Sequence, residues 1–206
     1  NSMVYATVGI HPHNAKDASR ADLLEIMELA RDKRVVAWGE IGLDFFKNYS
    51  PKREQISIFM SQLEVADELN LPVVIHERNA REELYSILVS RGKGEYRGVI
   101  HCFSEDLAYA TRFIELGFFI SIPGIVTFKR AEGLKEVAQK IPISSMLLET
   151  DAPFLAPEPF RGKTNEPSYL IWTAKEVARL KNISLEELAN ETTLNAKRLF
   201  GIQLPI

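Results

Sequence analysis

The sequence predicts an α/β fold in which parallel strands alternate with helices, arranged as a TIM-type (β/α)8 barrel that is incomplete over these 206 residues. Short apolar runs rich in β-branched residues alternate with longer runs of helical period, and all four histidines lie at the carboxyl ends of the predicted strands. A barrel spends roughly 31 residues on each strand–helix unit, so six units fit and eight do not. A doubly wound open sheet is the alternative, and the strand-end residues favour the barrel.

Continuous apolar character predicts six strands buried on both faces, as in a parallel sheet. They cover residues 4–10, 35–41, 72–77, 98–103, 118–124 and 145–151. Helices are predicted from residue 19 to 30, from 51 to 69, from 79 onward, and over 105–116, 131–140, 167–181, 184–190 and 192–200. The expected caps are Ser50 before Pro51 at the first helical position, and the capping boxes Asn79 with Glu82 and Ser184 with Glu187.

The composition is typical of a globular protein without a membrane span. Apolar residues make up 46% and charged residues 26%, and no apolar run approaches the roughly 18 residues that a membrane helix needs. The net charge is −3, so any attraction for nucleic acid comes from a few loops and bound cations. Cys102 is the only cysteine, which excludes an internal disulfide, favours a reducing compartment and is interpreted as a small buried apolar residue. We expect a monomer.

Four side chains at strand ends form the predicted metal site: Glu40, His76, His101 and Asp151. Strand alternation points His76 and His101 toward the mouth of the barrel, where active sites of this fold are built. A carboxylate directly after an apolar strand, such as Glu40, is costly unless it binds a metal or a cation. Histidine and carboxylate ligands suit one or two zinc or manganese ions, and carboxylate-rich sites also admit magnesium. Asp151 is also the predicted general base.

Other polar residues near the strand ends carry alternative interpretations. Glu149 shares a face with Asp151 but lies deeper, where it would pair with or orient a neighbour. Asp44 is interpreted as a loop-capping residue rather than a ligand. His11 is expected to contact a phosphate or water, whereas for His13 a plain loop histidine and a role in the site are equally favoured.

Two loops are candidates for substrate contacts. The proline-stiffened segment 153–167 contains Arg161, whose planar fork of donors suits a phosphate, and Lys163, which adds a point charge. A solvated basic loop is the alternative. The aromatic side chains of residues 45–49 could stack on bases, although packing aromatics are the commoner explanation.

Six motifs in this order resemble those of the TatD family of deoxyribonucleases in the amidohydrolase superfamily. They are Gly-Ile-His-Pro-His, Gly-Glu-Ile-Gly-Leu-Asp, Val-Ile-His-Glu-Arg-Asn, Ile-His-Cys-Phe-Ser, Glu-Thr-Asp-Ala-Pro and Phe-Arg-Gly-Lys-Thr-Asn-Glu-Pro. The resemblance implies a cytoplasmic metal-dependent phosphodiesterase that trims single-stranded DNA as a 3′-5′ exonuclease, with RNA as an alternative substrate. It also implies that Glu40 bridges two metals, that His76 and His101 bind one of them, and that Asp151 binds metal and takes a proton. His11 and the Arg161 loop would then lie near the substrate phosphate.

The family also begins with a strand ending in Asp-x-His-x-His, and this motif is absent from the sequence. The resemblance therefore implies that the natural protein is longer at its N-terminus by two βα units, and that residues 1–206 are a single, N-terminally truncated barrel domain. Two further functions stay open: a metal-dependent ester or amide hydrolase on the same scaffold, such as an aminoacyl-RNA deacylase, and an inactive fragment.

Overall fold

The computed structural model describes residues 4–92 and 97–202, and these contain six strands and seven α-helices. The strands follow one another in the sheet in chain order, β1-β2-β3-β4-β5-β6, as a parallel sheet. The α/β class with a parallel six-stranded sheet is therefore confirmed. The chain divides into two compact units: unit 1 extends to Ile100 and resumes at Lys197, and unit 2 is His101–Ala196. The prediction of one domain over 1–206 stays a prediction.

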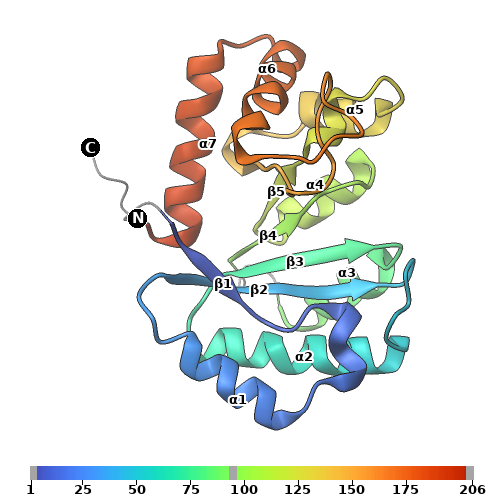
Figure 1. Ribbon diagram of the computed structural model, residues 1–206, viewed down its shortest axis with the longest axis vertical. Coiled ribbons are helices and arrows are strands. Elements are labelled where there is room, and N and C mark those ends of the chain that lie inside the picture. Colours follow the sequence, from blue (N-terminus) through green and yellow to red (C-terminus); the bar gives the residue numbers. More distant parts are fainter. Residues whose placement is uncertain (1–3, 93–96, 203–206) are drawn as a thin grey trace. The chain divides into compact units, whose positions relative to one another are not determined.

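Unit 1 contains the first strands of the sheet and the helices that alternate with them. Its elements are β1 (Ala6–Val8), the 3-10 helix η1 (Pro12–Asp17), α1 (Arg20–Leu29), β2 (Val35–Asp44), α2 (Lys52–Glu68), β3 (Val73–Arg78) and α3 (Arg81–Ser90), followed by β4 (Gly98–His101), whose last residue begins unit 2. Strands β1, β2 and β3 lie side by side, and α2 packs against β2 (Figure 1). Phe59 and Leu63 of α2 are fully buried, as are Trp38 and Ile75 of the strands. This apolar layer is the core that holds the strand ends in place.

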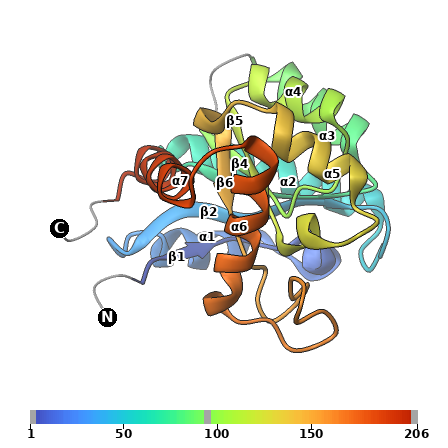
Figure 2. The ribbon, with the colours of Figure 1, turned by 90° about the horizontal axis from the view of Figure 1, so that it is seen from above.

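Unit 2 repeats the same alternation. Its elements are α4 (Leu107–Glu115), β5 (Phe118–Ile122), η2 (Gly124–Thr127), α5 (Glu132–Lys140), η3 (Ile143–Ser145), β6 (Met146–Leu148), η4 (Pro167–Tyr169), α6 (Leu170–Lys181) and most of α7 (Leu185–Phe200). Helix α4 packs against β5, and α5 packs against both α4 and α6 (Figure 2). No helix of the described residues combines the length and the apolar character that a membrane span requires.

All six predicted strands are present, but two predicted helix starts are wrong. Helix α2 begins at Lys52 after Pro51 and has no side-chain cap. Ser50 is buried instead, and its hydroxyl donates to the His13 carbonyl (2.8 Å) and accepts from the Lys16 N–H (3.0 Å). The Ser50 hydroxyl therefore forms tertiary hydrogen bonds and does not provide the cap of α2 that the local sequence pattern predicts.

The capping box at Asn79 is also wrong. Asn79 adopts a left-handed conformation (φ 54°), α3 begins two residues later at Arg81, and the Ala80 N–H donates to Glu77 Oε1 (2.7 Å). A buried carboxylate from the preceding strand thus satisfies the start of the helix. Ser184 does accept from the Glu187 N–H (3.0 Å), as predicted for that pair.

The predicted helices 184–190 and 192–200 are one continuous helix, α7. Thr192 lies in its interior, and its hydroxyl donates to the Leu188 carbonyl one turn earlier (2.9 Å). Because its hydroxyl is satisfied within the helix, Thr192 does not compete for the backbone groups of the helix as it would at a cap or turn.

Strands β2 and β3 approach so closely at Gly42 that a side chain does not fit. A Cβ atom there would lie 2.0 Å from the His76 carbonyl oxygen, and the residue has φ +140°. We predict that Gly42→Ala lowers the free energy of unfolding by roughly 1–3 kcal/mol or more through overpacking. Gly133→Ala is the control, because a Cβ at this exposed helical site meets nothing within 4 Å and should stabilise the helix slightly. Chemical denaturation of both variants is the measurement, and equal effects would contradict the prediction.

Candidate functional site

Three histidines gather at the carboxyl ends of the strands of unit 1. His11 follows β1, His13 lies in η1 and His76 lies in β3, and one ring nitrogen of each lies within 4.8 Å of the others. The His11 and His13 rings meet edge to face with their centroids 4.3 Å apart. We call these three residues the histidine cluster.

Two carboxylates of β2 face the histidine cluster. Glu40 Oε1 lies 2.7 Å from Nδ1 of His76 and 3.7 Å from Nε2 of His11. The fully buried Asp44 places Oδ2 2.8 Å from Nε2 of His13 and 3.1 Å from Nε2 of His76. The structure thus brings together the predicted residues His11, Glu40 and His76 with His13 and Asp44, whose roles the sequence left open or favoured elsewhere.

The donor set of unit 1 fits a divalent metal. Both ring nitrogens of His76 face carboxylates, Nδ1 toward Glu40 and Nε2 toward Asp44. Imidazole nitrogens and carboxylate oxygens gathered this closely are groups that could hold a metal ion. Imidazoles and carboxylates are both common ligands of divalent metal ions in proteins.

His11 is held in its neutral form. Its Nδ1 accepts from the His13 N–H (3.2 Å), which leaves the proton on Nε2, on the side of Glu40. Burial lowers the pKa of His11 to about 4; Glu40 opposes this shift, and His76 and His13 reinforce it. Near neutral pH the side chain is therefore a neutral donor at Nε2.

Asp44 caps a loop, as predicted, and faces the cluster as well. Its Oδ1 accepts from the N–H groups of Phe46 (3.1 Å) and Lys47 (2.7 Å), while Oδ2 faces the histidines. Burial opposes ionisation, but the Lys47 N–H, His13 and His76 hold the pKa of this carboxyl below its usual value. Strand alternation places residues 40, 42 and 44 on one face, and this pattern could have pointed to Asp44.

Two glutamines of α2 hold the backbone on which the cluster is mounted. Gln62 accepts from the Ile10 N–H (2.6 Å) and donates to the Ile10 carbonyl (2.9 Å), directly before His11. Gln55 does the same for Asp44, accepting from its N–H (2.8 Å) and donating to its carbonyl (3.0 Å). Sequence reasoning missed both. The signal was two glutamines seven residues apart on the apolar face of one helix, which the structure buries completely.

Unit 2 contains a second group of predicted site residues. His101, the last residue of β4, places Nδ1 2.8 Å from Glu149 Oε2 and Nε2 3.5 Å from Asp151 Oδ1. The Cys102 N–H also donates to Glu149 Oε2 (3.1 Å), and Cys102 is half-buried with φ 47° rather than extended. The other carboxylate oxygen of Glu149 is buried without a hydrogen-bond partner among the described residues. An orphaned carboxylate oxygen beside an imidazole also fits a cation.

The loop after Asp151 is held by the buried Asn165. Its amide donates to the carbonyl oxygens of Thr150 and Phe154, both at 2.6 Å. Arg161 and Lys163 lie exposed on this loop. The Arg161 guanidinium lies 4.4 Å from the centre of the Phe128 ring, and Lys163 Nζ lies 5.7 Å from that of Phe160. Both cationic side chains are thus exposed to solvent and each lies next to an aromatic ring.

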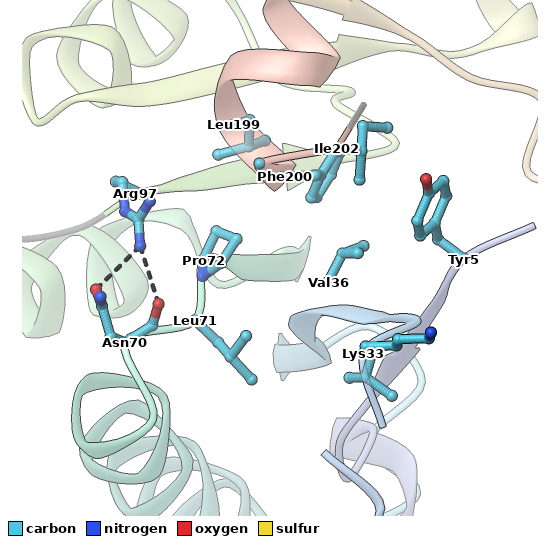
Figure 3. Close-up of a pocket in the computed structure, with 12 residues that line it drawn as sticks. Tyr5, Lys33, Val36, Asn70, Leu71, Pro72, Arg97, Leu199, Phe200 and Ile202 are labelled. Carbon is cyan, nitrogen blue, oxygen red and sulfur yellow. Dashed lines mark hydrogen bonds between the residues drawn. The ribbon is translucent and has the colours of Figure 1, made fainter. Parts of the chain in front are cut away.

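A cavity of about 610 Å³ lies at the other ends of the strands of unit 1 (Figure 3). Val35 and Val36 at the start of β2 line it, together with Pro72 before β3 and Phe200 of α7. Arg97 at its edge donates to the carbonyl and side-chain oxygens of Asn70 (Figure 3). Neither the histidine cluster nor Glu40 and Asp44 line this cavity, so it is not the predicted metal site.

We predict that Gln62→Leu destabilises unit 1 beyond the loss of one side chain. It leaves the N–H and carbonyl of Ile10 and the Trp38 Nε1–H, which also donates to Gln62 (3.2 Å), without partners. Each buried orphan costs roughly 1–3 kcal/mol. Gln139→Leu on the exposed side of α5 is the control. Urea denaturation is the measurement, and equal midpoints for the two variants would contradict the assignment.

The lowered pKa of His11 predicts a pH-dependent stability of the metal-free protein. The unfolded chain binds a proton on His11 below about pH 6.5, and the folded chain does so only near pH 4. The stability that the folded protein owes to a neutral His11 is therefore fully present above pH 6.5, and it is lost as the pH falls from 6.5 toward 4. His11→Asn keeps an acceptor for the His13 N–H but does not titrate. Between pH 7 and 4.5, in chelator, wild type should lose about 2 kcal/mol more unfolding free energy than His11→Asn. Parallel profiles would show that His11 is not perturbed.

Comparisons with known proteins place this chain in a family. The family model described as TatD related DNase matches residues 1–201. A Bacillus subtilis protein named uncharacterized metal-dependent hydrolase YabD is 46% identical over 199 residues, which cover 97% of this chain and 78% of that protein. An Erwinia amylovora protein named 3′-5′ ssDNA/RNA exonuclease TatD is 38% identical over 203 residues, which cover 96% and 78%.

A solved structure agrees with this result. The crystal structure of YjjV, a TatD homologue from Escherichia coli K12, matches with a TM-score of 0.87 and 33% identity. The match covers 97% of this chain and 77% of that chain. The chain therefore belongs to the TatD related DNase family of metal-dependent hydrolases.

Proposed function

We propose that this hydrolase is a nuclease that removes nucleotides from single-stranded DNA in the 3′-to-5′ direction. The observation that carries the proposal is the meeting of three histidines with Glu40 and Asp44 at the carboxyl ends of β1, β2 and β3. The name of the Erwinia amylovora relative supports a nuclease acting on single-stranded DNA or RNA. RNA is therefore the alternative substrate.

The proposed metal ligands are the residues whose donor atoms already converge in each unit. In unit 1 these are Glu40 and His76, with His13 beside them. In unit 2 they are His101 and Asp151, with Glu149 orienting the imidazole. A divalent ion, when bound, supplies Lewis-acid chemistry that makes water acidic near neutral pH and neutralises charge developing on the phosphoryl group.

The remaining roles follow from the protonation and exposure of the side chains. Asp151 is the proposed general base, because its carboxylate is partly exposed and oriented by His101. The neutral His11 would donate its Nε2–H to a phosphate oxygen. Arg161 offers a fork of donors to a second phosphate, and Lys163 adds positive charge on the same loop.

The test is the cleavage of 5′-labelled and 3′-labelled single-stranded DNA with magnesium, manganese, zinc or chelator. We predict that wild type shortens the DNA stepwise from its 3′ end only with metal. Glu40→Gln and Asp151→Asn should each lower the rate by at least about 100-fold, since they remove a ligand or a base but keep the side-chain shape. Glu28→Gln is the control, because Glu28 is an exposed carboxylate of α1.

Calorimetric titration of manganese or zinc into the same proteins separates binding from catalysis. Glu40→Gln should bind metal more weakly than Glu28→Gln. Wild-type rates in both site variants would remove Glu40 and Asp151 from the mechanism. Metal-dependent cleavage of an aminoacyl ester, with no cleavage of DNA or RNA, would establish the ester or amide hydrolase instead.

A further inference from the structure

We propose that the loop after β2 is a stacking surface for the bases of single-stranded nucleic acid, an inference that rests on the proposed function. We call residues 45–51 the aromatic loop. It connects the end of β2 to the start of α2 and contains Phe45, Phe46 and Tyr49. The sequence left open whether these rings pack internally or contact a ligand.

Two of the rings are turned to solvent. Phe46 and Tyr49 are each 55% exposed, and Phe45 is less exposed than either. Single exposed apolar side chains are common, but two aromatic rings three residues apart on one short loop form a small apolar platform. A flat exposed ring offers the face on which any base can stack.

Cations accompany these rings. The Arg78 guanidinium lies 4.1 Å from the centre of the Phe46 ring, and Lys52 Nζ lies 4.4 Å from that of Phe45. Residues 45–53 contain three basic residues and no acidic one, with Asp44 and Glu54 flanking them, whereas the chain as a whole has a net charge of −3. The loop therefore combines ring faces with positive charge, which matches bases joined by phosphates and disfavours a purely apolar peptide as a partner.

Hydrogen bonds hold the aromatic loop in one conformation. Asp44 Oδ1 accepts from the N–H groups of Phe46 and Lys47. At the other end, the Ser50 carbonyl accepts from Gln55 Nε2 (2.7 Å) and the Ser50 hydroxyl donates to the His13 carbonyl. A pre-organised platform loses little conformational entropy when a base stacks on it.

The same contacts place the platform beside the histidine cluster. The Tyr49 and His13 rings lie 4.8 Å apart, and the carboxylate of Asp44 joins the loop backbone to His13 and His76. A base stacked on Tyr49 would therefore bring its own phosphate toward the cluster. A duplex does not offer unstacked bases, so this surface would select single strands.

The test measures binding rather than cleavage. Fluorescence anisotropy with chelator present gives the Kd of a labelled single-stranded oligonucleotide and of an abasic oligonucleotide of equal length. We predict that Phe46→Ala and Tyr49→Ala each raise the Kd for the normal strand by about tenfold. Tyr49→Phe should bind as wild type does, because the ring remains. Leu29→Ala is the control, because Leu29 is an exposed apolar residue at the end of α1, before β2 begins.

The abasic strand decides whether base stacking is the cause. Wild type and both alanine variants should bind it equally and weakly. Equal loss on both strands, or no loss on the normal strand, would overturn the stacking surface even if wild-type protein with metal still cleaves DNA. If wild type neither binds nor cleaves either strand, the proposed function fails as well, so the two failures are distinguishable.

Discussion

The geometry of unit 1 depends on the side-chain amides of α2. Gln62 and Gln55 each form a pair of hydrogen bonds with one backbone residue, Ile10 and Asp44 respectively. The N–H and carbonyl groups of these two residues pair with glutamine side chains, and a buried unpaired N–H or carbonyl is costly. The two glutamines remove that cost, and in doing so they set the positions from which His11 and the Asp44 carboxylate project.

Electrostatic interactions decide the charge of the buried carboxylate and imidazole groups of this site. Asp44 is fully buried, and its ionised form is sustained by backbone N–H groups on one oxygen and imidazoles on the other. In His11, in contrast, burial lowers the pKa more than Glu40 raises it, so the side chain stays neutral near pH 7. Burial and these neighbours together thus shift the pKa values of His11 and Asp44. Groups whose pKa values are perturbed in this way cluster at functional sites.

Much of the fold was predictable because strands buried on both faces are nearly continuous apolar runs. All six strands were found in this way, and His76 and His101 lie in the second half or at the end of their strands as expected, whereas β2 continues four residues past Glu40 to Asp44. The helix starts at Ser50 and Asn79 were mispredicted for one shared reason. In both, another hydrogen bond replaces the expected cap: Ser50 bonds His13 and Lys16, which are far from it in the chain, and a carboxylate of the preceding strand accepts from the Ala80 N–H.

The sequence by itself determined the class of the fold, the family and the residue types available for chemistry, because strand periodicity and motif order are local properties of the chain. Only the tertiary structure decided that His13 and Asp44 join His11, Glu40 and His76, and that Gln55 and Gln62 hold them. These relations join residues up to 65 positions apart in the chain. Their existence depends on the packing of α2 against the strands, which the pattern of any single segment does not reveal.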